Sequence, residues 1–233
     1  MMMNFTLSNQ VQIPAVGIGT FMMTPDQAEQ AVVDALACGY RMIDTAQAYM
    51  NERAVGRGIK RSGVAREDIF ISTKIWASQY LTEGTVEKSL ELLGTDYIDL
   101  MFIHQPAGDF MAGYRKLETV AIRPMVNQIE MHPYFAQESA LKVMEEYQIV
   151  PEAPLGGGRH NPFDNEMVKE IAAAHGKTVG QVVLRWNVQR GVVVIPKSVH
   201  KARIEENFQI WDFTLTEEEM QKISSLDLGY QGT

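Results

Sequence analysis

The sequence predicts an α/β fold, most simply a (β/α)8 barrel formed by a single domain over residues 1–233. Short apolar runs alternate with longer amphipathic runs at spacings of roughly 25–30 residues, which is typical of repeated strand–helix units. Most of the apolar runs are continuous, as expected for parallel strands covered on both faces. No GxGxxG motif follows the first run, where Gly17–Thr20 holds only a fragment of it. This disfavours the open dinucleotide-binding sheet.

Seven parallel strands are expected, preceded by a small hairpin. The hairpin pairs Phe5–Leu7 with Val11–Ile13 around Ser8-Asn9-Gln10. The strands follow in order at Ala15–Thr20, Arg41–Asp44, Ile69–Lys74, Ile98–His104, Met125–Glu130, Ile149–Glu152 and Val192–Pro196.

Helix signals lie between these strands. Thr24 and Pro25 suit the N-cap and first position of one helix, which Gly39 ends. Asn51 is the expected N-cap of a helix over Glu52–Arg61. Further helices are expected over Val86–Leu93, over Glu138–Tyr147, from Pro162 to His175, and from the cap Thr178 to Gly191.

Composition excludes several classes of function. The 29 Asp and Glu outnumber the 21 Lys and Arg, giving a formal charge of −8, which disfavours sequence-independent nucleic-acid binding. The single cysteine, Cys38, excludes an intramolecular disulfide and CxxC metal or redox sites. No apolar run reaches the ~18 residues of a membrane span, and Met1–Phe5 does not resemble a signal peptide. We therefore expect a cytoplasmic monomer without a metal site or membrane contact.

Polar residues converge at the predicted carboxyl ends of the first four strands, where barrel enzymes carry their active sites. Thr20, Asp44, Lys74 and His104 end these strands, and Tyr49 follows Asp44 in the next loop. Each alone has a purely structural explanation, such as a turn cap, rim packing, a solvated strand end or a buried histidine. Together, four ionisable residue types at one barrel mouth predict a catalytic site.

The motifs around these residues resemble those of the aldo-keto reductase family, in order and over nearly the whole chain. They are Asp44–Glu52, Thr73–Trp76, Ile103–Pro106, Asn127–Glu130, and Ile195–Ser198 with Arg203, Glu206 and Asn207. Gln105–Asp109 is most similar to the bacterial branch that reduces small aldehydes and diketo-gluconate. The resemblance implies an NADPH-dependent oxidoreductase that reduces small aldehydes or ketones to alcohols by hydride transfer.

The resemblance also implies a role for each catalytic residue. Tyr49 would donate the proton to the developing alkoxide. A free phenol titrates near pH ~10, and a neighbouring ammonium lowers that value. Lys74, held by Asp44, would supply the ammonium, and His104 would orient the carbonyl oxygen. Phe21, Trp76 and His104 would form the substrate wall.

The same resemblance assigns the cofactor site. Lys197, Ser198 and Arg203 offer cations and a hydroxyl near a helix start, which suits the 2′-phosphate of NADPH. An exposed basic helix start is the alternative. The remaining assignments are Glu206 and Asn207 to the adenine, Gln128 to the carboxamide, and Thr20 and Asp44 to the nicotinamide ribose.

The chain departs from the family pattern at two places. One βα unit, roughly 30 residues or more, is missing between Tyr114 and Thr119, and Glu152–Gly156 is shortened where the family carries an aromatic residue. Either the polypeptide lacks these segments, or the printed chain omits residues there; we favour omission, because deleting a strand would expose two sheet edges.

Two other functions remain open at this stage. The missing unit leaves room for a non-catalytic nicotinamide-binding protein of the same fold. Independently of the family, Lys74 could act as the Schiff-base nucleophile of a barrel lyase.

Overall fold

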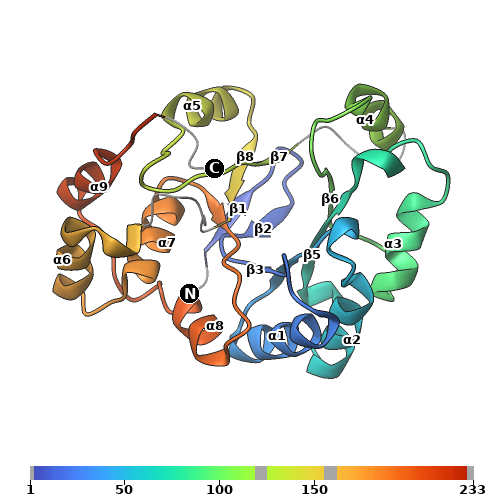
Figure 1. Ribbon diagram of the computed structural model, residues 1–233, viewed down its shortest axis with the longest axis horizontal. Helices are drawn as coiled ribbons and strands as arrows, with labels where there is room; N and C mark the ends of the chain where they lie inside the picture. Colours follow the sequence, from blue (N-terminus) through green and yellow to red (C-terminus); the bar gives the residue numbers. More distant parts are fainter. Residues whose placement is uncertain (1–2, 119–124, 155–161, 230–233) are drawn as a thin grey trace. The chain divides into compact units, whose positions relative to one another are not determined.

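The computed structural model describes residues 3–118, 125–154 and 162–229 (Figure 1). The chain divides into two compact units. Unit 1 comprises Met1–Val16, Met125–Pro196 and Glu205–Thr233, and unit 2 comprises Gly17–Pro124 and Lys197–Ile204. The single domain over residues 1–233 stays a prediction. Among the described helices, none has the length and apolar character of a membrane span.

Unit 2 contains a four-stranded parallel sheet in the order β3-β4-β5-β6. Its strands are β3 (Ile18–Gly19), β4 (Met42–Asp44), β5 (Phe70–Ile75) and β6 (Leu100–Ile103). They confirm the first four predicted strands. The register pairs Gly19 with Asp44, and Asp44 with Ser72. Because the strands are parallel and in register, their carboxyl ends lie along one edge of this sheet.

Helices of unit 2 follow the strands, as the repeat predicts (Figure 1). They are α1 (Pro25–Cys38), α2 (Glu52–Ser62), α3 (Thr85–Leu93) and α4 (Phe110–Glu118). The Thr24 and Gly39 caps of α1 are confirmed, with a capping box to Gln27 and Gly39 at φ 113°. The buried positions of α1, Ala28, Ala31, Val32, Ala35 and Leu36, repeat at the helical spacing that gives one apolar face.

The prediction that Asn51 is the N-cap of α2 is confirmed. Asn51 occupies the N-cap position, but its side chain makes no capping hydrogen bond. The side chain is buried: its oxygen accepts from Thr45 in its own loop, and its nitrogen donates to the backbone oxygens of Thr20 and Met23 in the loop after β3.

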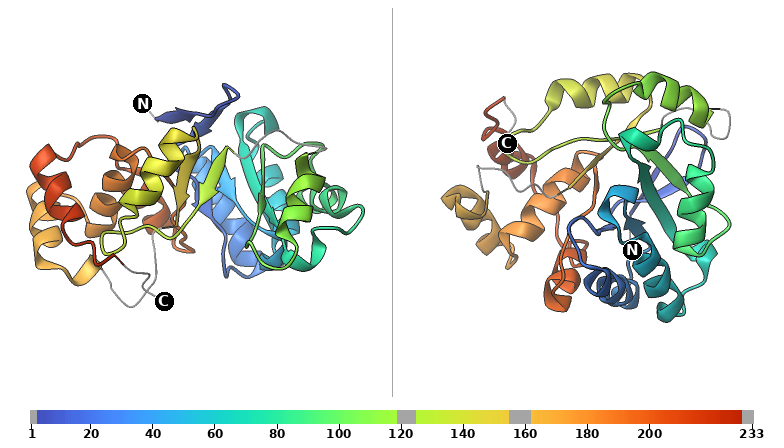
Figure 2. Two further views of the ribbon diagram at one scale, coloured as in Figure 1. Left: turned by 90° about the horizontal axis from the view of Figure 1, so that it is seen from above. Right: turned by 45° about the vertical axis from the view of Figure 1, so that its right-hand side comes forward.

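Unit 1 contains the predicted hairpin and the last three predicted strands. The hairpin pairs β1 (Asn4–Thr6) with β2 (Gln12–Pro14) in antiparallel register and is dark blue in Figure 2. A parallel sheet has the order β7-β8-β9. Its strands are β7 (Val126–Gln128), β8 (Val150–Ala153) and β9 (Val193–Val194). Here Gln128 pairs with Glu152 on the central strand.

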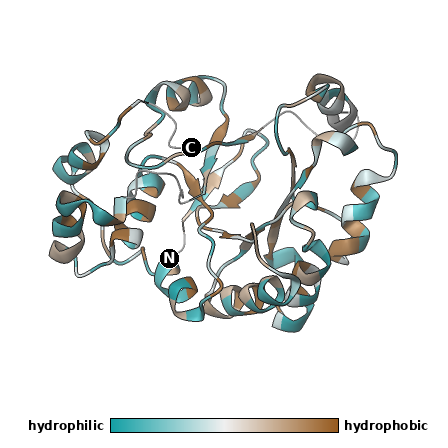
Figure 3. Cartoon of the chain, viewed as in Figure 1, coloured by the Kyte–Doolittle hydropathy of each residue, from teal (hydrophilic) through white to brown (hydrophobic). Residues whose placement is uncertain are grey.

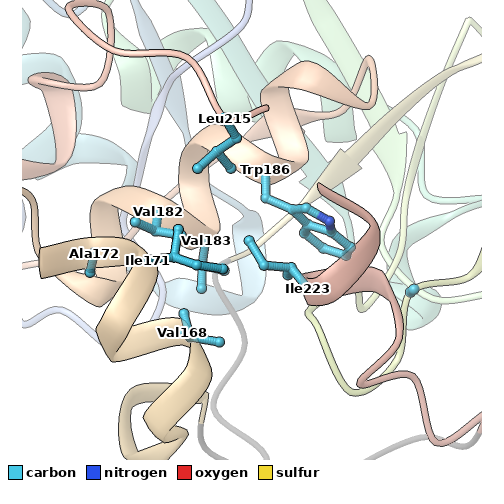
Figure 4. Packing of buried hydrophobic residues seen from close by; sticks show 9 residues of the cluster. Val168, Ile171, Ala172, Val182, Val183, Trp186, Leu215 and Ile223 are labelled. Atoms are coloured by element: carbon cyan, nitrogen blue, oxygen red, sulfur yellow. The ribbon is translucent and has the colours of Figure 1, made fainter. Parts of the chain in front are cut away.

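The helices of unit 1 are α5 (Glu138–Glu146), α6 (Glu166–Ala174), α7 (Val179–Gln189) and α9 (Glu217–Ser224), whereas α8 (Lys201–Phe208) begins in unit 2 and ends in unit 1. Figure 3 shows hydrophilic and hydrophobic residues on different sides of the helices. Apolar side chains of α6, α7 and α9 pack around fully buried Trp186 (Figure 4). Thr178 caps α7 as predicted, with a capping box to Gln181.

Some helix boundaries differ from the prediction. Pro162–Asp164 forms a separate 3₁₀ turn, and α6 begins after Asn165, whose side chain accepts the Val168 N–H. The sequence did not predict α4 or α9, nor the extent of α8. A signal for α9 was present, because Thr216 and Glu219 form a capping box. In α4, Gly113 lowers the helix propensity of the segment.

Seven parallel strands are present in the described residues, four in one sheet and three in the other. β6 and β7 are edge strands of their respective sheets. The suspected missing unit lies between them in sequence. Residues 119–124 of that segment, and residues 155–161 at the second shortened place, are outside the described residues.

Candidate active site

A buried ion pair lies at the carboxyl ends of β4 and β5. The Lys74 ammonium is 2.6 Å from both carboxylate oxygens of Asp44 and donates to the backbone oxygen of Thr45 at 2.9 Å. Asp44 is 2% exposed and Lys74 is 1% exposed. Ser72 donates to Asp44 Oδ1 at 2.8 Å. The three hydrogens of the Lys74 ammonium and the Ser72 hydroxyl, both from β5, therefore satisfy this pair, which is the condition for a charge pair to be tolerated in the interior.

Two further side chains, Thr20 and Asn51, fix the loops around the ion pair. Thr20 Oγ1 donates to the backbone oxygen of Asp44 at 3.0 Å. Asn51 donates to the backbone oxygens of Thr20 and Met23 and accepts from Thr45 Oγ1 at 3.0 Å. The loops after β3 and β4 are thus held together by one buried amide.

Tyr49 lies next to this ion pair, as predicted. It ends the 3₁₀ turn Gln47–Tyr49 that follows β4. Lys74 Nζ is 5.2 Å from the centroid of the Tyr49 ring. Phe21, which is 56% exposed, packs against the same ring with a centroid distance of 5.1 Å. The phenol therefore stands between a buried cation and an exposed aromatic residue.

His104 completes the cluster from the end of β6. Its ring meets the Tyr49 ring edge-on at a centroid distance of 5.5 Å and the Trp76 ring at 5.1 Å. Desolvation by burial lowers the pKa of His104, and the nearby Lys74 charge lowers that pKa further. A neutral imidazole results, which offers one N–H as a hydrogen-bond donor.

Glu52 is a buried carboxyl group whose role the sequence did not predict. It is 3% exposed and accepts from Thr73 Oγ1 at 2.7 Å. Burial raises the pKa of Glu52, against the hydrogen bonds from Thr73 and Ser89. Glu52 thus binds the side chain of the residue directly before Lys74.

The predicted phosphate-binding residues Lys197, Ser198 and Arg203 belong to unit 2, the same unit as Tyr49 and Lys74. Ser198 is buried, whereas Lys197 and Arg203 are exposed, and neither cation takes part in an ion pair within the described residues. Arg203 lies in the first turn of α8. This donor set of two free cations, a hydroxyl and a helix start fits a phosphate group.

Tyr40 anchors that segment within unit 2. Its hydroxyl donates to the backbone oxygen of Ile204 at 3.1 Å, and the residue is 1% exposed. Burial raises the pKa of the Tyr40 phenol, so it remains a donor.

The other proposed cofactor residues, Gln128, Glu206 and Asn207, belong to unit 1. Gln128 Nε2 donates to Glu152 Oε1 at 2.5 Å. Glu206 accepts from Thr178 Oγ1 at 2.8 Å. Their roles toward the nicotinamide and adenine stay predictions.

An open groove of about 870 Å³ borders Trp76 in unit 2. Its wall includes Gln47, Met50, Gln79 and Lys88. Trp76, which contacts the His104 ring, and Gln47, which belongs to the same turn as Tyr49, therefore also line this groove.

Comparisons with known proteins address the whole chain. The model of the aldo/keto reductase family matches residues 15–121 and 111–228. A 9,11-endoperoxide prostaglandin H2 reductase of Trypanosoma cruzi is 42% identical, over 95% of this chain and 90% of that protein. A glyoxal reductase of Bacillus subtilis is 41% identical, over 95% of this chain and 91% of that protein. The crystal structure of MGS-M4, an aldo-keto reductase from a deep-sea metagenome library, has a TM-score of 0.93 at 37% identity, covering 98% of this chain and 96% of that one.

The chain belongs to the aldo-keto reductase family. The aldo-keto reductase fold, an α/β fold of the (β/α)8 barrel type with an N-terminal hairpin, is confirmed. The function is confirmed at the level of an oxidoreductase that reduces carbonyl groups with a nicotinamide cofactor.

The alignments also bear on the missing segment of this aldo-keto reductase. The alignment with the Trypanosoma relative spans 257 positions, more than the 233 residues of the chain. It therefore passes over positions where the relative has a residue and this chain has none. The two matches of the family model meet within residues 111–121, next to the place where the sequence analysis expects the missing βα unit.

Proposed function

We propose that this aldo-keto reductase reduces small aldehydes and ketones with NADPH, and that Tyr49 is the proton donor. NADPH supplies the hydride when it is bound. The observation that carries the proposal is the position of the Lys74 ammonium, 5.2 Å from the Tyr49 ring and clamped by Asp44. A fixed positive charge beside a phenol favours transfer of its proton.

The other two candidate acids fit this task less well. The contacts of Lys74 with both Asp44 oxygens and with Thr45 match its three donor hydrogens, and the residue is 1% exposed. A lowered pKa makes His104 a poor source of a proton at neutral pH, but leaves it one N–H for the carbonyl oxygen. Tyr49 is only partly buried, so a substrate oxygen can reach it.

The same contacts weigh against a Schiff-base lyase. A nucleophilic lysine needs a free lone pair and access to the substrate. The buried, ion-paired ammonium of Lys74 offers neither. Borohydride trapping of a carbonyl substrate on Lys74 would nevertheless support that alternative and contradict the proposal.

NADPH is proposed over NADH because Lys197 and Arg203 are exposed cations on either side of Ser198 in the sequence. A 2′-phosphate adds two negative charges that such a set can bind. Glu206, Asn207, Gln128, Thr20 and Asp44 are proposed to contact the rest of the cofactor. The cytoplasmic location and the monomeric state remain predictions.

Small dicarbonyls are the first substrates to test, because one relative is named a glyoxal reductase and another, from Yersinia pestis, a methylglyoxal reductase. The experiment follows NADPH oxidation with a panel of small aldehydes, diketones and keto sugars. Tyr49→Phe should lose most of the turnover while its NADPH affinity persists. Turnover within a few-fold of the unmodified enzyme would reject Tyr49 as the acid. NADPH binding without turnover on any substrate would favour the non-catalytic alternative.

A further inference from the structure

Gln47 lies two positions before Tyr49, at the start of the same 3₁₀ turn. Its Oε1 accepts the backbone N–H of Trp76 at 3.2 Å. Its Nε2 donates to the backbone oxygen of Thr85 at 3.2 Å, with Thr85 Oγ1 and Ser89 Oγ also within 3.2 Å. One amide therefore links the turn that carries Tyr49 to the substrate wall and to the start of α3.

Chemistry fixes the orientation of this amide. A backbone N–H can only donate, so the atom that faces Trp76 N must be the oxygen of Gln47. A backbone carbonyl can only accept, so the atom that faces Thr85 O must be the nitrogen. The amide of Gln47 therefore cannot be rotated by 180° without losing both hydrogen bonds.

The Gln47 contacts close a ring of neighbours around the reaction centre. The Tyr49 ring contacts the His104 ring, and the His104 ring contacts the Trp76 ring. The Trp76 backbone N–H donates to the side chain of Gln47, which belongs to the same turn as Tyr49. The aromatic contacts alone would let the Tyr49 turn shift relative to Trp76, whereas this hydrogen bond joins the two loops directly.

A buried chain of hydrogen bonds continues from Gln47 toward Lys74. Ser89, which is fully buried, bonds both Gln47 and Glu52. Glu52 in turn accepts from Thr73, the residue before Lys74. These hydrogen bonds therefore link the start of the Tyr49 turn to the residue before Lys74.

We propose that Gln47 is a positioning residue for carbonyl reduction: it fixes the Tyr49 hydroxyl relative to His104 and Trp76. The inference rests on the proposed role of Tyr49 as the proton donor. Gln47 does not touch the reacting atoms and acts through the turn and the Trp76 loop. Misplacement of an acid by about 1 Å can cost up to a hundredfold in rate.

The test compares Gln47→Leu with Gln47→Glu and with the control Gln79→Leu. Gln47→Leu keeps the size and removes every polar contact. Gln47→Glu keeps an oxygen for the Trp76 N–H but loses the donor to the Thr85 carbonyl. Gln79 borders the same groove, and its side chain contacts Ser78. The control therefore repeats the chemical change next to Trp76 without breaking the link to the Tyr49 turn.

Each variant is measured for kcat and KM with glyoxal and with benzaldehyde, for the pH dependence of kcat/KM, and for NADPH affinity and stoichiometry. We expect Gln47→Leu to lose about ten- to a hundredfold in kcat per bound NADPH, with NADPH affinity within about twofold. The alkaline limb of the pH profile should shift, and KM for the bulkier benzaldehyde should rise more than KM for glyoxal. Gln47→Glu should recover part of kcat, and Gln79→Leu should match the unmodified enzyme.

A merely structural role would reduce the amount of competent enzyme without changing kcat per bound NADPH or the shape of the pH profile, and that result would overturn the inference. If Gln47→Leu does not fold, the same criteria apply to Gln47→Glu. Tyr49→Phe distinguishes a failure of the proposed role of Gln47 from a failure of the proposed role of Tyr49. An inactive Tyr49→Phe with a fully active Gln47→Leu rejects only the role of Gln47, whereas an active Tyr49→Phe rejects the acid assignment and this inference with it.

Discussion

Lys74 and Asp44 form a buried ion pair in which the ammonium is 2.6 Å from each carboxylate oxygen. They come from neighbouring parallel strands, β5 and β4, and both are at most 2% exposed. The strand register places Ser72 opposite Asp44, so Lys74 stands one side-chain repeat further along the same face. The pair therefore occupies the sheet edge where Tyr49 and His104 also lie.

Lys74→Met should impair kcat/KM more than NADPH affinity, because it removes the charge beside Tyr49. It also leaves Asp44 buried without its cation, which costs about 3–5 kcal/mol of stability. Asp44→Asn should lose less activity, since Lys74 keeps its charge but is less well placed.

The double variant Asp44→Asn/Lys74→Met should lose less activity than the sum of the single losses, because both residues act through one network. The measurement is a double-mutant cycle on kcat/KM with one good aldehyde, corrected for active enzyme by NADPH titration. Strict additivity would show that the two residues act independently, and the proposed path from Asp44 through Lys74 to Tyr49 would be abandoned.

Arg203→Ala should weaken NADPH binding about ten- to a hundredfold, through loss of a charge-assisted contact to the 2′-phosphate. NADH, which lacks that phosphate, should bind nearly as before. Fluorescence titration with both cofactors measures the two dissociation constants. Lys60→Ala, which removes an exposed cation from α2, is the control and should affect neither. An equal loss for both cofactors would mean that Arg203 does not contact the 2′-phosphate.

Glu52→Gln should flatten the pH dependence of stability above the ordinary titration range of glutamate. Burial raises the pKa of Glu52 in the folded state, so the unfolded chain releases its proton first as pH rises. The stability contribution of Glu52 is therefore complete below the unfolded pKa and is lost as pH rises through the folded pKa.

The glutamine variant has no such titration, so its stability relative to the unmodified protein should increase with pH across that window. Urea unfolding at a series of pH values measures this difference. The exposed Glu67→Gln is the control and should show a constant offset. A constant offset for Glu52→Gln as well would contradict a raised pKa.

Gly56→Ala should destabilise the protein by about 1–3 kcal/mol. A Cβ at Gly56 in α2 would overlap the backbone of Leu93 at the end of α3, so the two helices would have to move apart. Elsewhere, replacing glycine by alanine inside a helix stabilises by about 0.5–1 kcal/mol. Gly180→Ala in α7, where the added Cβ would meet its nearest atom at an ordinary 3.5 Å, is the matched control. Denaturant unfolding should give opposite signs for the two substitutions, and equal signs would refute the close α2–α3 contact.

The sequence by itself determined the seven parallel strands, the hairpin, the caps Thr24 and Thr178, and the positions of Asp44, Lys74 and His104 at the strand ends. Each of these depends on a local signal. A continuous apolar run makes a buried strand, a threonine oxygen reaches an N–H three residues on, and a polar residue at a strand end faces the barrel mouth.

Only the tertiary structure decided the roles of Asn51, Gln47 and Glu52. Asn51 has the local appearance of a helix cap, but its partners Thr20 and Met23 lie far back in the chain. Gln47 reaches Trp76 and Ser89, which are brought to it by the pairing of β4 with β5 and by the packing of α3. A side-chain amide takes whichever partners the fold leaves unsatisfied around it. Those partners follow from strand register and helix packing, which no local pattern encodes.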